Sequence, residues 1–525
     1  MRRFMHSIQG LGACAALSIA AAFATSDANA APLPIVAKHS GKCLDITGGP
    51  GATQDGAPAE QWECTGATNQ SWTIQSDGHG RFQLIALHSG KCLWAPSGAE
   101  GALVQQTTCD VNDVKQIWVK QVAGAANEFK FLQVSGGRCL DVDGSGTGNG
   151  PAVKLRLCSG ADNQTWTIGR NPFWWPFISS SIWNTPIGSG AVYVPANLPA
   201  VPDDPNDGVD VMWTPMPQID EERIVLVPTA PATVINYSSA GWTGADRCIA
   251  TPPAPAATHL PVTVPIPTNY TLPSSSKNNG AAFLLSDGHT LVQTQPWTRC
   301  SAGASATSVA RIFDGGVDAD IISGDGRNGA HGGSRLGTLG GTIRLGEMRP
   351  GSRGPRHALK INLFSPMELF NCTQASECFR WPAYTSDSGA SVEYGEIGNN
   401  QNVAMKMGSL LAIPPSVNIN NIGLLTEPGR QIAWTLQNYG AYVVDTTGGA
   451  AFGLSAEVGF HGSKLDEFFA DYGMDMNARV GHGADSDWGR DLQIIRPLLK
   501  VVNNNDPTHV GGGGTPRQPL APPFQ

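Results

Sequence analysis

Apolar and polar residues alternate over short stretches along much of the chain, and this pattern dominates its first third. The segments "RFQLIAL" (81–87) and "EFKFLQV" (128–134) carry apolar residues at about every second position, and glycine-rich turns lie between such segments. A period of about two predicts half-buried β-strands. We therefore expect the first third to consist of short strands joined by turns.

Beyond residue 180 the pattern stays mostly β, but proline interrupts it at first. Apolar stretches as far as Pro273 are short, as in "RIVLVP", "ATVINY" and "PVTVPIP", which predicts irregular edge strands. Clearer strands are predicted in "AAFLLSDG", "HTLVQTQ", "SVARIFDGG", "GGTIRLGEM", "HALKINLF", "GSLLAIPP" and "AYVVD". We expect one mostly-β domain over residues 181–525, a β-sandwich or jelly roll with a few helices packed outside.

Two segments carry helix signals instead. Residues 427–440 place Pro428 in a first turn and Gly440 at the end. Residues 463–473 begin with Ser463, which is suited to cap a helix, and end at Gly473. These are the helices that the pattern predicts.

A unit of 46 to 48 residues occurs three times in the first third. The segments "NQSWTI", "KQIWVK" and "NQTWTI" place Trp72, Trp118 and Trp166 at these intervals (72 to 118 and 118 to 166). Each unit also carries one of "KCLDITGG", "KCLWAPSG" and "RCLDVDGS". A period in this range indicates a repeated supersecondary unit. We expect the three units to share one core, with the tryptophans inside it and the glutamines fixing the backbone.

The motifs of these units resemble those of a known family. Residues 33–168 resemble a ricin B-type lectin domain in their Cys-Leu-Asp, Cys and Gln-x-Trp signals, except that Trp94 replaces the aspartate in the second repeat. The resemblance implies a carbohydrate-binding β-trefoil at 31–168, and we place a linker at 169–180. "HGGSRLGTLGGTIRLGE", "RHALKIN" and "RWPAY" are similar to segments of exported bacterial proteins of unassigned function, which implies no activity.

The resemblance also implies which residues hold a sugar. Family members use an aspartate, an aromatic ring and an asparagine; a carboxylate accepts hydrogen bonds from hydroxyls, and the apolar sugar face stacks on a ring. Repeat two has Trp94, Thr107 and Lys115 at these places and is expected to be structural, and Arg156 replaces the ring in repeat three. The residues expected to bind carbohydrate are Asp45, Glu60, Trp62, Asn69 and Gln70 in repeat one, and Asp141, Asn163 and Gln164 in repeat three.

Composition limits the class of protein. A chain of 525 residues with 41% hydrophobic residues is long enough for two or three domains with cores of their own. A formal charge of −9 excludes a basic nucleic-acid surface. No later apolar run is long enough to cross a bilayer, so we expect no membrane insertion. We expect a monomer whose partner is an oligo- or polysaccharide.

The N-terminus and the cysteines indicate export. Residues 1–30 have two arginines, an apolar stretch and an Ala-Asn-Ala cleavage site, which is typical of a signal peptide. Its removal takes Cys14 and leaves ten cysteines, an even number suited to disulfides in an oxidising compartment. The pairs expected are Cys43–Cys64, Cys92–Cys109, Cys139–Cys158, Cys248–Cys300 and Cys372–Cys378. We therefore expect an extracellular or periplasmic protein.

Candidate catalytic residues are concentrated in the second half of the chain. Glycan hydrolysis needs two carboxylates beside a sugar, with an aromatic floor such as Trp381 or Tyr384. The residues we expect to serve are Glu347, Asp387 and Asp445, with His357 as an accessory acid or base. A strand at "GGTIRLGEM" would send Arg344 and Glu347 to opposite faces. For each residue, a role in a surface ion pair is the alternative.

Three functions stay open at this point. The architecture favours a secreted glycoside hydrolase that its lectin domain tethers to substrate. A lyase that uses His357, Lys360 or Tyr384 as base, and a non-catalytic lectin or adhesin, are the alternatives. No cofactor is required. Calcium near Asp314, Asp318 and Asp320 is a further hypothesis, although the spacing of these residues is not that of an EF-hand.

Overall fold

A computed structural model describes most of the chain. It covers residues 33–521 except for 63–66, 124–127, 170–171, 174, 201–211, 215–221, 243–245, 276–277, 313–319, 349, 351–352, 481–485 and 519. The expected signal peptide at 1–30, Cys64, Asp314 and Asp318 therefore lie outside the described residues. Within the described part, no helix is long and apolar enough to cross a membrane.

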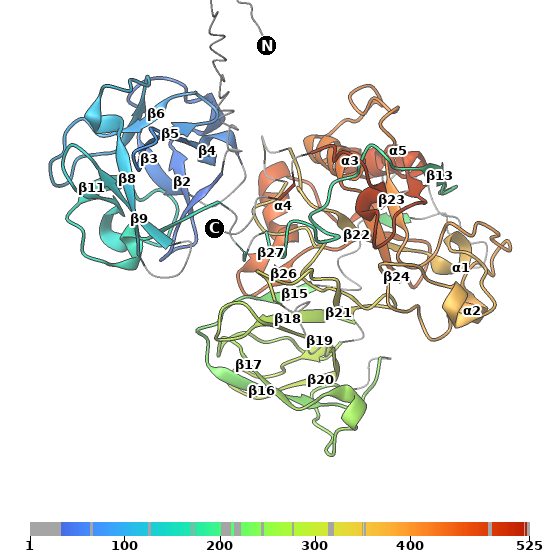
Figure 1. Cartoon of the computed structure of the whole chain (residues 1–525). Helices are drawn as coiled ribbons and strands as arrows, with labels where there is room; N and C mark the ends of the chain where they lie inside the picture. The colour runs from blue at the N-terminus through green and yellow to red at the C-terminus, as the bar shows by residue number, and fades with distance from the viewer. Residues whose placement is uncertain are drawn as a thin grey trace, which may run out of the picture.

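The three repeats form a β-trefoil of twelve strands (Figure 1). The first and last strands pair antiparallel, with Ile35 opposite Ile168, and this closes the domain. The strands are β1 (Ile35–Ala37), β2 (Cys43–Ile46), β3 (Ala59–Trp62), β4 (Trp72–Ser76), β5 (Arg81–Ala86), β6 (Cys92–Trp94), β7 (Gln105–Thr107), β8 (Trp118–Val122), β9 (Glu128–Gln133), β10 (Cys139–Val142), β11 (Val153–Arg156) and β12 (Trp166–Ile168).

The trefoil core contains the tryptophan of every Gln-x-Trp. Trp72, Trp118 and Trp166 are at most 1% exposed and belong to one apolar cluster. Their indole N–H groups donate to Leu44, Leu93 and Leu140 carbonyls at 2.9, 3.1 and 2.9 Å, respectively. Each ring is therefore tied to the strand that follows the first cysteine of its own repeat. The predicted shared core is confirmed.

Disulfides join the cysteines in sequential pairs wherever both partners are described. The bonds are Cys92–Cys109, Cys139–Cys158, Cys248–Cys300 and Cys372–Cys378. Cys43 is also disulfide-bonded, but Cys64 lies outside the described residues. The four described pairs are those predicted from the sequence. Two of them close one loop each in repeats two and three.

The larger C-terminal region contains two six-stranded sheets. The first has the order β13-β29-β23-β24-β22-β25 and consists of β13 (Tyr193–Pro195), β29 (Lys500–Val502), β23 (Leu410–Ala412), β24 (Ala441–Thr446), β22 (Leu359–Leu363) and β25 (Phe452–Leu454). The second has the order β15-β18-β19-β20-β16-β17 and consists of β15 (Glu222–Val225), β18 (Gly280–Leu284), β19 (Leu291–Thr298), β20 (Ala306–Ile312), β16 (Ala232–Tyr237) and β17 (Val262–Pro265).

Both sheets are mixed. β22 and β24 are parallel in the first sheet, and β15 runs parallel to β18 and β16 to β20 in the second. The shorter strands are β14 (Met212–Thr214), β21 (Asn328–His331), β26 (Val458–Gly459), β27 (Gly462–Ser463) and β28 (Ala478–Val480). The predicted mostly-β region with few helices is confirmed, whereas the predicted strand at "GGTIRLGEM" is wrong, because residues 341–348 form turns apart from a single bridge at Ile343.

Both predicted helices are present. α3 (Glu427–Asn438) starts after Thr426, whose hydroxyl accepts from the Gly429 N–H, and has Pro428 in its first turn. α4 (Lys464–Tyr472) starts after Ser463 and stops at Gly473, which has a φ of 66°. The other helices are α1 (Ser365–Glu368), α2 (Ala390–Glu393) and α5 (Asp487–Ile495), together with several 3-10 turns.

The junction between the two regions is only partly a linker. The Phe177 N–H donates to the Ile321 carbonyl at 2.6 Å, and the Ile178 N–H donates to the Gly324 carbonyl at 2.9 Å. Phe177 is 1% exposed and belongs to the apolar cluster that also holds Trp183 and Tyr442. Residues 177–178 are thus packed into the C-terminal region, although the sequence placed them in a linker.

Candidate functional site

The strand register shows which residues of the three repeats are equivalent. In each repeat the strand that begins with the first cysteine pairs with the next strand, and this cysteine lies opposite Trp62, Thr107 or Arg156. Two residues further on, Asp45 lies opposite Glu60, Trp94 opposite Gln105 and Asp141 opposite Lys154. Directly opposed residues of an antiparallel pair point to the same face. Each repeat therefore presents these residues as one patch.

In repeat one, two amides hold a buried carboxylate in place. Asp45 is 4% exposed. The Asn69 amide donates to both of its carboxylate oxygens at 3.0 Å, and the Gln70 amide donates to Oδ2 at 2.7 Å. Asn69 also donates to the Ile46 carbonyl at 3.1 Å. The carboxylate is thus fixed before any ligand arrives, which lowers the entropic cost of binding.

Glu60 and Trp62 form the rim of the same patch. Trp62 is 38% exposed, so its ring is available to stack on the apolar face of a ligand. Burial raises the pKa of Asp45 to about 7, and the negative charge of Glu60 adds to this rise. Burial also raises the pKa of Glu60, although a hydrogen bond with Thr47 counteracts this. The patch combines a ring, a fixed carboxyl group and an amide.

Repeat three keeps the buried part of this arrangement and changes the rim. The Asn163 and Gln164 amides donate to Asp141 Oδ2 at 3.0 and 2.8 Å, as their equivalents do in repeat one. The equivalents of Glu60 and Trp62 are Lys154 and Arg156. Burial raises the pKa of Asp141, whereas the positive charge of Arg156 lowers it.

Repeat two lacks a free carboxylate. Its Trp94 indole N–H donates to Asp113 Oδ2 at 3.1 Å, so the side chain that replaces the aspartate is itself bound within the repeat. Gln116 donates to the Thr108 carbonyl at 2.9 Å and accepts from the Asp110 N–H at 2.8 Å. This repeat retains the Gln-x-Trp framework, with Trp94 at the place of Asp45 and Asp141.

In the C-terminal region, a turn of two glycines lies against two carboxyl groups. The turn follows β21, and Asp445 lies near the end of β24, opposite Asn362 of β22. Asp445 Oδ1 accepts from the Gly333 N–H at 3.0 Å. A Cβ atom at Gly332 would overlap the carboxyl group of Asp445, and one at Gly333 would lie 2.5 Å from Asp387 Oδ2. Only glycines let both carboxyl groups approach this turn.

Tyr394 connects these two carboxyl groups electrostatically. Its hydroxyl donates to Asp387 Oδ2. Burial raises the pKa of Asp387. The pKa of Tyr394 is raised by burial first, then by the charge of Asp387, and to a smaller extent by that of Asp445. The sequence brought no attention to Tyr394, because a single tyrosine after a short helix carries no motif.

A buried cluster of polar side chains flanks the same turn in the sequence and contacts the segment that follows it. Glu222, His331 and Lys360 are at most 1% exposed. Lys360 Nζ donates to Glu222 Oε1 at 2.5 Å and to the Thr338 and Gly337 carbonyls at 2.7 and 3.1 Å. His331 Nδ1 contacts the same Glu222 oxygen. Because three acceptors surround its ammonium group, we assign Lys360 a structural role.

One of the two aromatic candidates adjoins the glycine turn. The backbone N–H of Tyr384 donates to the Ser334 carbonyl at 3.0 Å. Its hydroxyl accepts from Arg327 Nε at 2.8 Å, and the Arg327 guanidinium lies 4.3 Å from its ring centroid. Trp381 instead packs against an apolar core cluster.

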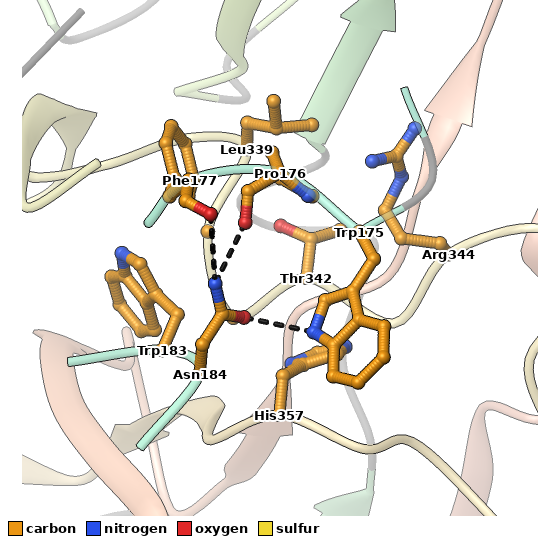
Figure 2. A pocket seen from close by; sticks show the side chains of 11 residues that line it. Trp175, Pro176, Phe177, Trp183, Asn184, Leu339, Thr342, Arg344 and His357 are labelled. Atoms are coloured by element: carbon orange, nitrogen blue, oxygen red, sulfur yellow. Dashed lines mark hydrogen bonds between the residues drawn. The ribbon is translucent and has the colours of Figure 1, made fainter. Parts of the chain in front are cut away.

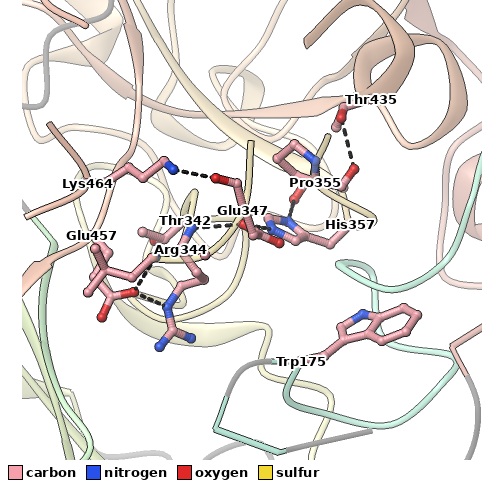
Figure 3. A network of polar contacts seen from close by, with 12 residues as sticks. Trp175, Thr342, Arg344, Glu347, Pro355, His357, Thr435, Glu457 and Lys464 are labelled. Carbon is pink, nitrogen blue, oxygen red and sulfur yellow. Dashed lines mark hydrogen bonds and ion pairs between the residues drawn. The ribbon is translucent and has the colours of Figure 1, made fainter. Parts of the chain in front are cut away.

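Glu347 and His357 form a separate pair at the other end of β22 (Figure 3). Glu347 Oε2 lies 3.1 Å from His357 Nε2 and accepts from the Arg344 N–H at 2.8 Å. Burial lowers the pKa of His357, but the Glu347 carboxylate and a hydrogen bond with the Ala358 carbonyl together raise it overall. His357 precedes Asn362 by five residues, about 16 Å along a strand. Glu347 therefore does not join Asp387 and Asp445.

A small pocket lies beside this pair (Figure 2). The Asn184 side chain spans it, accepting from the Trp175 indole at 2.9 Å and donating to the Pro176 carbonyl at 2.8 Å. The pocket has room for about one water molecule and none for a sugar ring. Its lining residues are Trp175, Pro176, Phe177, Trp183, Asn184, Leu339, Gly340, Gly341, Thr342, Arg344 and His357.

The calcium hypothesis falls largely outside the described residues. Asp314 and Asp318 are not described. Asp320 Oδ1 accepts from the Ile322 and Ser323 N–H groups at 2.7 and 2.8 Å, and its Oδ2 lies 2.7 Å from His289 Nδ1. Among the described residues, no group of three or more His, Cys, Asp or Glu side chains is placed to hold a metal ion.

Comparison with known proteins identifies the first domain. Residues 31–167 match the family model described as the ricin-type beta-trefoil lectin domain. This match covers the three repeats and ends before the C-terminal region. A search of curated proteins finds no match to the chain.

Several solved structures are similar to about a quarter of the chain. A designed three-fold symmetric protein, ThreeFoil, is 34% identical over 27% of this chain and 99% of its own, with a TM-score of 0.25. An exo-beta-1,3-galactanase from Clostridium thermocellum is 24% identical over 27% of this chain and 30% of its own, with a TM-score of 0.25. The Rhizoctonia solani agglutinin is 21% identical over 27% and 96%, with a TM-score of 0.24.

Proposed function

Because residues 31–167 belong to the ricin-type β-trefoil lectin family, we propose that this chain is an exported protein that binds a glycan through repeat one. The observation that carries the proposal is the single patch of Asp45, Glu60, Trp62 and Asn69. Its exposed ring lies beside a carboxylate that two amides already hold in place. Ring stacking and hydroxyl–carboxylate bonds are the two interactions that a sugar needs.

The patch is shallow, so each sugar makes few contacts. Affinity in the millimolar to micromolar range is expected, about 4 to 8 kcal/mol of binding free energy. The ligand class that fits best is a neutral sugar with two adjacent hydroxyls and one apolar face. Several such sugars along a polymer would raise the retention of the chain on its surface.

Replacing Trp62 with alanine should weaken binding of a neutral oligosaccharide by at least about tenfold, because the stacking surface is lost, about 1.4 kcal/mol or more. Isothermal titration of the full-length protein measures this. Thr107→Ala is the matched control, since Thr107 occupies the equivalent place in repeat two and should leave affinity unchanged. If Trp62→Ala binds as tightly as wild type with an unchanged melting temperature, repeat one is not the site.

Sugar binding should also depend on pH through Asp45. Its folded-state pKa of about 7 lies above the ordinary value of 3.8, so folding favours the protonated form and this group's contribution to stability is lost as pH rises from about 4 through 7. Sugar binding needs the ionised carboxylate, so affinity rises with pH, whereas this group's contribution to stability falls. We expect affinity to be about tenfold higher at pH 8 than at pH 6. Asp45→Asn should bind weakly at both pH values and without this dependence, and a flat wild-type profile would contradict the assignment.

Export is the part of the proposal that rests on the sequence. The signal-peptide pattern at 1–30 leads to an oxidising compartment, and the disulfides of the mature region suit one. N-terminal sequencing of the protein from culture medium or periplasm should begin near Ala31.

A second function, glycoside hydrolysis by the C-terminal region, has its own support. Asp387 and Asp445 lie against adjacent glycines of one turn. Asp387 is partly buried beside Tyr394, and this burial raises its pKa, which suits a general acid. Asp445 accepts from the Gly333 and Thr446 N–H groups, which suits an ionised base or nucleophile. Glu347 and His357 lie at the other end of β22 and have no part in this site.

Such an enzyme would gain from the lectin domain, because tethering raises the local concentration of polymer. A screen of the full-length protein on plant, algal and bacterial polysaccharides, measured by reducing-end release and ultraviolet absorbance, tests this function. New reducing ends without absorbance support hydrolysis. Absorbing products identify a lyase, for which Tyr384, beside the glycine turn, would be the base. Binding without cleavage identifies a lectin or adhesin.

A further inference from the structure

The rim of repeat three differs from that of repeat one in charge. Lys154 and Arg156 occupy the places of Glu60 and Trp62, as the register shows. Burial alternates along both strands, although Trp62 is exposed and Arg156 is only half-buried. Lys154 therefore points to the same face as Asp141, and Arg156 follows on that face. Two cations replace a carboxylate and a ring.

The buried half of the patch is nevertheless intact. Asp141 is 5% exposed, and both Asn163 and Gln164 donate to its Oδ2, as their equivalents do in repeat one. Asn163 also donates to the Val142 carbonyl at 3.0 Å, which matches the bond from Asn69 to Ile46. Repeat two has lost the buried aspartate, because Trp94 stands in its place and donates to Asp113. Repeat three has retained the hydroxyl-binding group.

The cations have partners that a ligand can displace. Lys154 Nζ lies 2.7 Å and Arg156 Nη2 2.5 Å from the carboxylate of Asp143, and Arg156 Nη1 lies 3.6 Å from Glu100. The side chains of Lys154, Arg156 and Asp143 are 29%, 36% and 30% exposed. Ion pairs this exposed contribute little net stability. An arginine also has five N–H donors, more than these contacts use.

We propose that repeat three binds an acidic sugar, one that carries a carboxylate or a sulfate group, through Arg156 and Lys154. The inference rests on the proposed function, in that it takes the patch of each intact repeat as a sugar site. The sugar's hydroxyls would bond to Asp141 and Asn163, as in repeat one. Its anionic group would take the place of the ring-stacking face and meet the guanidinium, whose planar donors match a carboxylate.

This gives the two intact repeats different ligands. Repeat one presents Asp45, Glu60 and a ring, and its charged groups repel an anion. In repeat three, the positive charge of Arg156 lies close enough to the Asp141 carboxylate to lower its pKa. A polymer with both neutral and acidic sugars would engage both sites at once, and avidity would then exceed either single affinity.

The test uses full-length protein and two probes, a neutral galacto-oligosaccharide and a trigalacturonate, with a sulfated galacto-oligosaccharide as a third arm. Two variants are compared. The double variant combines Lys154→Gln with Arg156→Met, which removes both charges and keeps the aliphatic parts of the side chains, and Trp62→Ala is the matched control. We expect the double variant to lose at least about tenfold in affinity for an acidic probe while keeping the neutral one. Trp62→Ala should do the reverse.

Salt gives an independent measurement. Raising ionic strength from about 0.05 to 0.5 M should weaken acidic-probe binding and leave neutral binding nearly unchanged, because exposed charges are screened. The inference is overturned if no acidic probe binds, if the double variant binds it normally, or if Trp62→Ala abolishes it. Failure of the neutral probe instead, with acidic binding retained and sensitive to Arg156, would overturn the repeat-one assignment alone.

Discussion

Replacing Asp445 with asparagine should lower the rate of polysaccharide cleavage by about 10²- to 10⁴-fold, the contribution of one positioned acid or base. The substitution keeps an oxygen that can accept from the Gly333 and Thr446 N–H groups, so the turn should be preserved. What is lost is the negative charge. Asp387→Asn should have a similar effect, because it removes the proton that a general acid supplies.

Initial rates on the polymer found by the screen measure this effect. Asp466→Asn on α4 is the control, since Asp466 is exposed and should leave the rate unchanged. Glu347→Gln separates the two candidate locations. If Glu347→Gln removes activity and Asp445→Asn retains it, the chemistry belongs to the pair beside the small pocket and the glycine turn is structural.

Replacing Lys360 with methionine should lower the free energy of unfolding of the C-terminal region by about 3–5 kcal/mol. The change removes the ammonium group from the buried Glu222 carboxylate and leaves the His331 imidazole as the contact of that carboxylate that the structure describes. It also removes the ammonium donor from the Thr338 and Gly337 carbonyls, although the Thr338 carbonyl keeps its bond from the Thr342 hydroxyl at 2.7 Å. An uncompensated buried charge is among the most destabilising changes a core can contain.

Chemical denaturation monitored by tryptophan fluorescence gives this value. The double variant Lys360→Met with Glu222→Gln removes both charges, and it should recover part of the loss. Arg490→Met at the exposed pair with Asp487, 3.9 Å apart, should change stability by less than about 1 kcal/mol. A Lys360 variant as stable as wild type would show that the ammonium group does not hold this cluster.

The trefoil was predictable because its information is local and repeated. Each repeat contains a cysteine, a glutamine and a tryptophan at equivalent positions, so three weak sequence motifs together indicate one fold. The tryptophans are buried, and the four disulfides with both partners described follow the predicted pairs. The different rim of repeat three was also within reach of the sequence, since alternation along "VKLR" puts Lys154 and Arg156 on one face.

The C-terminal arrangement was less accessible for a physical reason. Parallel pairing of β22 with β24 joins residues about 80 positions apart, and no local period records such a contact. The segment around Arg344 was predicted as a strand that separates Arg344 from Glu347. It is a turn in which the Glu347 side chain accepts from the Arg344 N–H. Tyr394 and Glu222, which complete the polar groups near Asp387 and His331, lie far from any motif.

The glycine pair at 332–333 was a visible signal without an interpretation. Two glycines after a histidine suggest a turn, but only the structure shows that a carboxyl group approaches each one. Convergence of Asp387 and Asp445 was one of the arrangements that the sequence left open, and Glu347 does not take part in it.

The most direct test of the central claim is a crystal structure of the full-length protein with a saturating neutral oligosaccharide. We expect a sugar ring on the Trp62 indole, with two hydroxyls within hydrogen-bond distance of Asp45 and one of Asn69. Electron density for the sugar only at repeat two or three, or only in the C-terminal region, would contradict the assignment of repeat one as the glycan site.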